Sequence, residues 1–194
     1  NMKDCIEAKL FGIGLESYTV GSYDFYLGYG AKKGKIVTLD TGHFHLTESI
    51  ADKISSMLLF TPEIMLHVSR PIRWDSDHVV ILNDDLQDLA REIIRCDALD
   101  RVHIGLDYFD ATINRIGAYV IGCRATQKAF IQALLEPSAL LNSYEENGQY
   151  FERLALQEEL KSMPWQAVWD YYCFLNDVPV GENYISEIQR YEQT

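Results

Sequence analysis

The sequence lacks long uninterrupted apolar runs, has few cysteines and does not begin with a recognisable targeting signal. No apolar run reaches the roughly 18 residues that a membrane-spanning helix needs, so we expect neither a transmembrane segment nor a membrane partner. The first residues do not show the basic-then-apolar order of a signal peptide, so we expect a cytoplasmic protein. The four cysteines form no C-x-x-C pair, which favours free thiols in a reducing compartment.

Basic side chains are also in short supply. The sequence has 17 basic and 29 acidic residues, which gives a formal net charge of −12 at pH 7. A chain of this charge repels phosphate backbones, so no nucleic-acid partner is expected. Because 47% of the 194 residues are hydrophobic and 24% are charged, the composition is that of a globular protein with enough residues for one core.

Short apolar segments alternate with longer amphipathic ones over the first two thirds of the chain. The apolar segments predict strands at residues 5–13, 35–39, 63–68 and 102–106. The amphipathic segments predict helices at residues 22–32, 47–60 with Thr47 as N-cap, 84–96 and 114–135. Since the strands are apolar on both faces, as buried parallel strands are, the order indicates four βα units of an α/β fold.

Four βα units cannot close a (β/α)₈ barrel, which needs eight strands and about 250 residues. The sequence therefore indicates either a small open α/β sheet or part of a larger barrel, and the outer strands of either would invite self-association. The pattern changes after Pro137 to charged and aromatic helical segments. We predict that residues 1–136 carry the four βα units and that residues 137–194 form a C-terminal helical extension, which packs on the barrel or on a neighbouring subunit.

Carboxylates and imidazoles gather at the ends of the expected strands. At or just past the ends of short apolar runs stand Asp40, His43, His67, Asp75, Asp77 and Asp107, and Glu7 lies in the first expected strand. Because the carboxyl ends of parallel strands share one edge of a sheet, side chains placed there can bind a common divalent cation. Oxygen-rich ligation with one or two imidazoles suits Mn²⁺, Mg²⁺ or Co²⁺ better than it suits structural zinc.

Each of these residues also has a purely structural interpretation. Asp40 or Asp107 taken alone is typical of a helix N-cap or a turn. Asp75 and Asp77 alone could lie in a solvated loop, and His67 alone could be a hydrogen-bonded imidazole in the core. The metal hypothesis therefore depends on the residues acting together.

Three other histidines and one aromatic segment have simpler interpretations. His103 stands in an apolar strand, so we predict a core imidazole there. His45 and His78 adjoin the candidate ligands and could hydrogen-bond to them. The aromatic residues of segment 165–172 are expected to pack against the sheet or another subunit.

Six segments, spread over nearly the whole chain, carry a resemblance to a known family. They are residues 7–14, 16–22, 39–45, 67–80, 100–110 and 164–169. The most specific of them contains Arg-Trp-Asp-Ser-Asp-His at 73–78. In this order they resemble the C-terminal part of the L-rhamnose isomerase family.

The resemblance implies a cytoplasmic, tetrameric enzyme that interconverts L-rhamnose and L-rhamnulose. It implies two divalent cations, typically Mn²⁺, with Mg²⁺, Co²⁺ or Zn²⁺ as possible substitutes. It also implies that the four βα units are the C-terminal half of a TIM-type (β/α)₈ barrel. The family's chain is longer, so we expect this sequence to be a fragment without the first half of the barrel, whose activity on its own is open.

Carried over residue by residue, the resemblance also assigns roles within the site. It implies four ligands of a structural cation: Glu7, Asp40, His67 and Asp107. It implies three ligands of a catalytic cation: His43, Asp75 and Asp77. It makes Lys9 and Asp107 catalytic residues, with Lys9 donating a hydrogen bond to the sugar oxygen.

Two other functions compete with sugar isomerisation. The chain could be a non-catalytic fragment that binds metal or associates with itself. A metal-dependent hydrolase is a weaker alternative, because His43-Phe44-His45 resembles the H-x-H of hydrolase metal centres. The pair formed by Glu7 and Lys9 favours the isomerase over the hydrolase.

Overall fold

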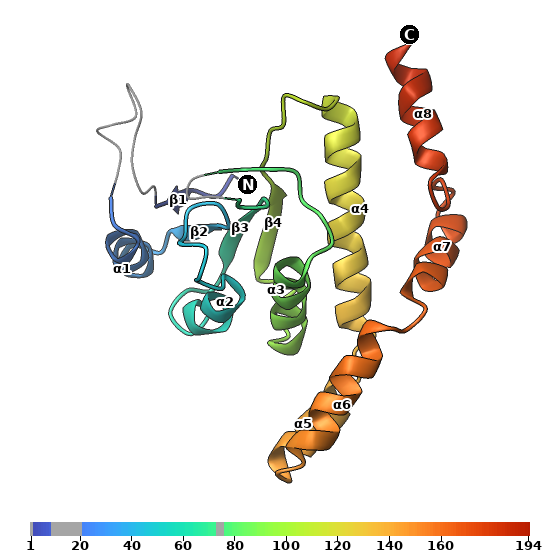
Figure 1. Cartoon of the computed structure of the whole chain (residues 1–194). Coiled ribbons are helices and arrows are strands. Elements are labelled where there is room, and N and C mark those ends of the chain that lie inside the picture. Colours follow the sequence, from blue (N-terminus) through green and yellow to red (C-terminus); the bar gives the residue numbers. More distant parts are fainter. Residues whose placement is uncertain (1, 9–20, 73–75) are drawn as a thin grey trace. The chain divides into compact units, whose positions relative to one another are not determined.

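The structure is a computed structural model that describes residues 2–8, 21–72 and 76–194 (Figure 1). Its contacts divide the chain into two compact units, Asn1–Ala129 and Phe130–Thr194. The predicted division at residue 137 stays a prediction. Within the described residues, no helix combines the length and the apolar character that crossing a membrane requires.

The first unit is built on one sheet of four parallel strands (Figure 1). The strands are β1 (Cys5–Glu7), β2 (Ile36–Asp40), β3 (Ile64–Val68) and β4 (Val102–Leu106). Their order in the sheet is the order in the chain, and every neighbouring pair is parallel. Parallel neighbours need crossover connections, which are made by α1 (Tyr23–Lys33), α2 (Ala51–Met57) and α3 (Asp84–Arg95). The predicted α/β class is therefore confirmed.

Polar caps explain where two of the crossover helices begin. The Ser22 side chain accepts a hydrogen bond from the Phe25 N–H at 3.2 Å and caps α1, which ends at Gly34 with φ 61°. The Asn83 side chain accepts a hydrogen bond from the Leu86 N–H at 3.1 Å and caps α3. Both helices begin where a side chain satisfies an N–H group that the helix itself leaves free.

The predicted helix at 47–60 is shorter in the structure, and its predicted cap is wrong. α2 begins after Ile50, which makes no side-chain cap hydrogen bond. Thr47 lies in the preceding loop, where its hydroxyl is 2.8 Å from His45 Nδ1. A threonine can bind a neighbouring side chain as readily as a helix end, and the sequence pattern does not distinguish the two. For the first strand, β1 ends at Glu7, and residues 9–13 of the predicted strand lie outside the described residues.

The core of the first unit lies between the sheet and its crossover helices. Strand residues at alternate positions are fully buried, and residues of α2 and α3 are buried with them: Val37, Leu39, Ile64, Leu66, Val68, Ile54, Met57, Leu89 and Ile93. Figure 1 shows α1, α2 and α3 on one side of the sheet. The alternate positions of β2 and β3, which point to the other face, include Asp40 and His67.

The second unit is helical. After α4 (Arg115–Leu134), which spans the boundary between the units, come α5 (Ser138–Glu146), α6 (Tyr150–Lys161), α7 (Trp165–Leu175) and α8 (Asn183–Glu192). An ion pair of 3.1 Å between Arg153 Nε and Glu145 Oε2 joins α6 to α5. In α7, Trp169 is buried and its ring centroid lies 5.7 Å from that of Tyr172.

Candidate metal centre

The carboxyl ends of the four strands bring four ligand-type side chains to one edge of the sheet. Glu7 and Asp40 are the last residues of β1 and β2, His67 is the last but one of β3, and Asp107 directly follows β4. Asp40 and His67 are partners in the parallel register. Because paired residues of neighbouring strands point to the same face, the sheet aims these side chains at a common point.

The distances at this point are compatible with a shared divalent cation. His67 Nδ1 lies 3.3 Å from Asp107 Oδ2, 3.4 Å from Glu7 Oε2 and 3.5 Å from Asp40 Oδ2. The Nδ1 atom is buried, and it has no hydrogen-bond partner in the part of the chain that the structure describes. Donor atoms about 2.1 Å from one cation lie about 3.0–3.4 Å from each other, depending on the coordination geometry. The donor atoms of Glu7, Asp40 and His67 thus lie close enough together to hold one cation, and Asp107 approaches the same nitrogen from the end of β4.

The charges in the cluster also suit a cation. Burial opposes ionisation of Asp40, but His67, the charge of His43 and the Gly42 N–H, which donates at 2.7 Å, together lower the pKa of Asp40. The carboxylates of Asp40 and then Glu7 raise the pKa of His67 to about 10. In the metal-free protein the positive charge of the His67 imidazolium thus compensates the negative charges of the carboxylates. A bound cation would compensate these charges instead, and His67 would lose its proton.

His43 and Asp77 lie beside this cluster. His43 Nδ1 is 2.9 Å from the Ala8 carbonyl oxygen and 3.3 Å from Glu7 Oε1, and its Nε2 is 3.9 Å from Asp40 Oδ2. Burial, followed by the negative charge of Asp40, raises the pKa of Asp77. A second cation at this position would relieve the repulsion between the two carboxylates.

The other predicted site residues have different outcomes. Lys9 and Asp75 lie outside the described residues, so their roles stay predictions. His45 pairs with Thr47, and the backbone of His78 forms an isolated β-bridge with Arg70.

The prediction that His103 is a core imidazole is wrong. The side chain is 41% exposed, and Nε2 lies 2.6 Å from Glu63 Oε2, which also accepts a hydrogen bond from Lys3. His103 stands on β4, at the edge of the described sheet, and Glu63 is positioned just before β3. The sequence of an apolar strand does not show whether a polar residue in it packs in the core or pairs with an acidic residue at the edge of the sheet.

Sequence reasoning missed three small residues that contact the ligand candidates. Thr41 and Gly42 follow β2 directly, and Ser69 follows β3. The Gly42 N–H binds Asp40, and the Ser69 hydroxyl donates to Asp77 Oδ1 at 3.0 Å. In the sequence, their position directly after the strands was the signal that could have indicated a role at the site. Their residue types gave no such indication, because they are common in loops.

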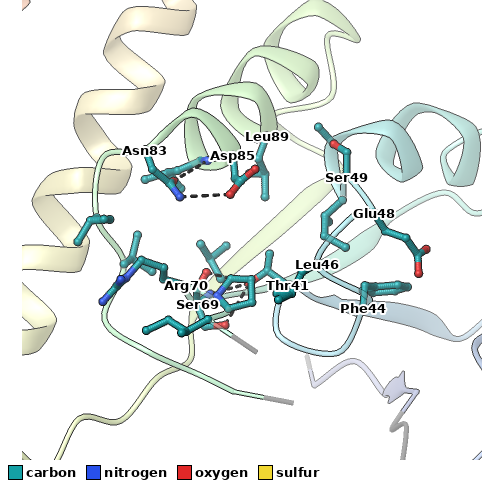
Figure 2. A pocket seen from close by; sticks show the side chains of 18 of the residues that line it. Thr41, Phe44, Leu46, Glu48, Ser49, Ser69, Arg70, Asn83, Asp85 and Leu89 are labelled. Carbon is teal, nitrogen blue, oxygen red and sulfur yellow. Dashed lines mark hydrogen bonds between the residues drawn. The ribbon is translucent and has the colours of Figure 1, made fainter. Parts of the chain in front are cut away.

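A cavity of about 280 Å³ is lined by Thr41 and Ser69, among other residues (Figure 2). Residues from the loops after β2 and β3 line it, together with residues of α3 such as Leu86 and Leu89. The described side chains that line the cavity do not include Glu7, Asp40, His67 or Asp107. Thr41 and Ser69 thus line this cavity, and Ser69 also donates a hydrogen bond to Asp77.

Comparison with known sequences finds one family, both in the family model and in the individual relatives. The family model of L-rhamnose isomerase (RhaA) matches residues 1–194. The L-rhamnose isomerase of Bacteroides thetaiotaomicron is 70% identical over 192 residues, which are 99% of this chain and 46% of the relative. Those of Enterobacter sp. and Pectobacterium carotovorum are each 59% identical, over 98% of this chain and 45% and 46% of the relatives. The chain spans about half the length of the curated relatives that it matches.

Proposed function

The chain belongs to the L-rhamnose isomerase family, and we propose that it supplies the metal-binding part of an enzyme that interconverts L-rhamnose and L-rhamnulose. The observation that carries this proposal is the convergence of Glu7, Asp40 and Asp107 on His67 Nδ1, a buried atom that no described residue satisfies. The relatives are named for this reaction.

We further propose that the four βα units are one half of a (β/α)₈ barrel. The strand order follows the chain without reversal, and right-handed crossovers then put successive helices on the same face of the sheet. Doubly wound open sheets instead reverse their strand order and carry helices on both faces. In a barrel the opposite face is the interior and the site lies at the carboxyl ends of the strands, where Asp40 and His67 lie. Residues 137–194 are then the helical extension outside the barrel.

Mn²⁺ is the proposed cation, held by Glu7, Asp40, His67 and Asp107. A second cation is assigned to His43 and Asp77 together with Asp75. When bound, a divalent cation polarises a sugar carbonyl and stabilises the negative charge that develops on oxygen as hydrogen moves between C1 and C2.

The protein's own groups then have distinct tasks. Asp40, with 3% of its surface exposed, keeps the first position enclosed on one side. The Asp107 side chain is 60% exposed, so it is the one of the four that a sugar hydroxyl reaches most easily. Lys9 follows Glu7 by two residues, and its ammonium is proposed to donate a hydrogen bond to the substrate oxygen, which would hold the open-chain sugar in one orientation.

The proposed partners are a small sugar and further copies of the same protein in a cytoplasmic tetramer. Among the described strands, β1 and β4 each pair on one side only. These edges support a larger sheet in the functional protein. They also support the second candidate function, a non-catalytic chain that binds metal and associates with itself.

Conversion of L-rhamnose to ketose in the presence of Mn²⁺ separates the two candidates. The assay uses this chain combined with the remaining part of the B. thetaiotaomicron relative, expressed as a separate polypeptide. We expect ketose formation that depends on Mn²⁺, is lost in Glu7→Gln and is kept in Asp97→Asn, a matched change at an exposed residue before β4. Mn²⁺ binding without any ketose formation by the unmodified pair would contradict the isomerase and favour the second candidate.

A further inference from the structure

Asp77 is connected by hydrogen bonds to the ends of two neighbouring strands. The Ser69 hydroxyl donates to Asp77 Oδ1 at 3.0 Å. Thr41 Oγ1 in turn lies 3.2 Å from Ser69 Oγ, donates to the Ser69 carbonyl oxygen at 3.0 Å and accepts from the Ser69 N–H at 2.8 Å. Because an ionised carboxylate only accepts hydrogen bonds, the single hydroxyl proton of Ser69 is committed to Asp77.

The backbone of Asp77 is held independently of this hydroxyl pair. The Asp77 carbonyl oxygen accepts from the Phe109 N–H at 3.2 Å. The next residue, His78, exchanges two backbone hydrogen bonds with Arg70, at 2.9 and 3.3 Å. The backbone at Asp77 and His78 is thus held by other contacts, and the Ser69 hydroxyl contacts the side chain of Asp77.

That direction brings Asp77 against Gly42. A Cβ atom at residue 42 would lie 2.3 Å from Asp77 Oδ1 and 3.2 Å from Asp40 Oδ1. Any side chain at this position would thus push the Asp77 carboxylate away from Asp40. The negative charge of Asp40 acts on Asp77, and two neighbouring carboxylates repel, so a hydrogen-bond donor on Asp77 helps to keep its side chain in this place.

We propose that Ser69, supported by Thr41, is a positioning residue that holds Asp77 beside Asp40 for the second cation. The inference rests on the proposed function, in which Asp77 and His43 belong to that second position. Ser69 binds Oδ1 of Asp77, and in the proposal the other carboxylate oxygen faces the cation. Hydroxyl groups that orient ligands in this way have a measurable effect, because loss of such a partner typically lowers metal affinity about 10–100-fold.

Mn²⁺ titration by isothermal calorimetry tests the proposal on the 194-residue chain. We expect two binding events in the parent chain. Ser69→Ala should weaken the second about 10–100-fold and leave the first within twofold. Ser69→Thr keeps the hydroxyl and has the adjoining cavity for its extra methyl group, so it should restore the second event. Ser56→Ala on α2, whose hydroxyl donates to backbone carbonyls of its own helix, is the matched control.

The titration results that would contradict the positioning role differ from those that would contradict the second cation position. Two unchanged events in Ser69→Ala, or equal weakening of both, would overturn the positioning role and leave the proposed function intact. A parent chain that binds a single Mn²⁺ would overturn both the second position and the positioning role. If Ser69→Ala does not fold, the near-isosteric Thr41→Val is titrated instead. A second Mn²⁺ binding event with unaltered affinity in that variant would overturn the role that we assign to Thr41 and Ser69 together.

Discussion

Asp40 and His67 are register partners on neighbouring parallel strands, and Asp40 Oδ2 lies 3.5 Å from His67 Nδ1. Glu7 and Asp107 approach the same nitrogen at 3.4 and 3.3 Å. These separations exceed those of charge-assisted hydrogen bonds, which are about 2.7–2.9 Å. The proposed cation would bring these charged groups together without hydrogen bonds between them, and Glu7, Asp40 and His67 are close enough to one another to hold it.

Binding of Mn²⁺ should raise the melting temperature, because a ligand that binds only the folded state stabilises it. At a hundredfold excess over Kd the gain is about 2.7 kcal/mol, or about 5–10 °C for a chain of this size. Asp40→Asn should lose most of the shift, and Asp97→Asn should keep it. Thermal scans by circular dichroism with and without Mn²⁺ measure the difference. An equal shift in Asp40→Asn would show that Mn²⁺ binds elsewhere.

Metal binding should release a proton from His67. Its pKa is raised from its ordinary value of 6.5 to about 10 in the metal-free protein, chiefly by Asp40 and then by Glu7. The stabilisation from the protonated imidazole is therefore complete below pH 6.5 and lost as the pH rises through about 10. Mn²⁺ needs the neutral imidazole, so its affinity should rise with pH across this window.

Calorimetry at pH 7.5 in two buffers of different ionisation enthalpy counts the released protons. We expect about one proton per Mn²⁺ at the first position. His103→Gln, which changes a histidine paired with Glu63, should leave the number unchanged. A binding enthalpy that is independent of the buffer would contradict the protonated state of His67.

Gly122 should be intolerant of a methyl group. Its Cβ would lie 2.1 Å from the hydroxyl oxygen of Tyr108, which is buried next to Asp107 and donates to the Ala118 carbonyl at 3.0 Å. Gly122→Ala should destabilise the chain by about 1–3 kcal/mol. Gly28→Ala, in an exposed part of α1 with open space around it, should stabilise by about 0.5–1 kcal/mol. Urea unfolding measures both, and a change of the same sign in both variants would refute the close-packing argument.

Two helix starts offer a paired test of capping. Asn83→Ala should cost about 1 kcal/mol of unfolding free energy, because the Leu86 N–H loses its side-chain acceptor. Thr47→Ala should change that free energy by less than about 0.5 kcal/mol, since Thr47 lies in a loop and α2 begins later. Urea unfolding checks this prediction as well. A larger effect at residue 47 than at residue 83 would reverse our assignment of the caps.

The sequence predicts the strands well because strands depend on local patterns, and the predicted ligand types then gather at one edge of the sheet, where the metal site stays a proposal. Asp40 and His67 end apolar runs, and parallel strands bring such ends together whatever the details of packing. Thr47 was predicted wrongly because its hydroxyl binds the nearby His45 instead of a helix end, and His103 was predicted wrongly because its partner Glu63 is distant in the sequence. Ser69 was missed for the same reason, since a serine in a loop acquires a role only when an aspartate is folded against it.

An anomalous difference map from crystals of the chain grown with Mn²⁺ tests the central claim most directly. The account predicts a peak about 2.1 Å from Glu7 Oε2, Asp40 Oδ2, His67 Nδ1 and Asp107 Oδ2. A map with no peak at these four atoms, or with Mn²⁺ bound only to carboxylates elsewhere on the chain, would contradict it.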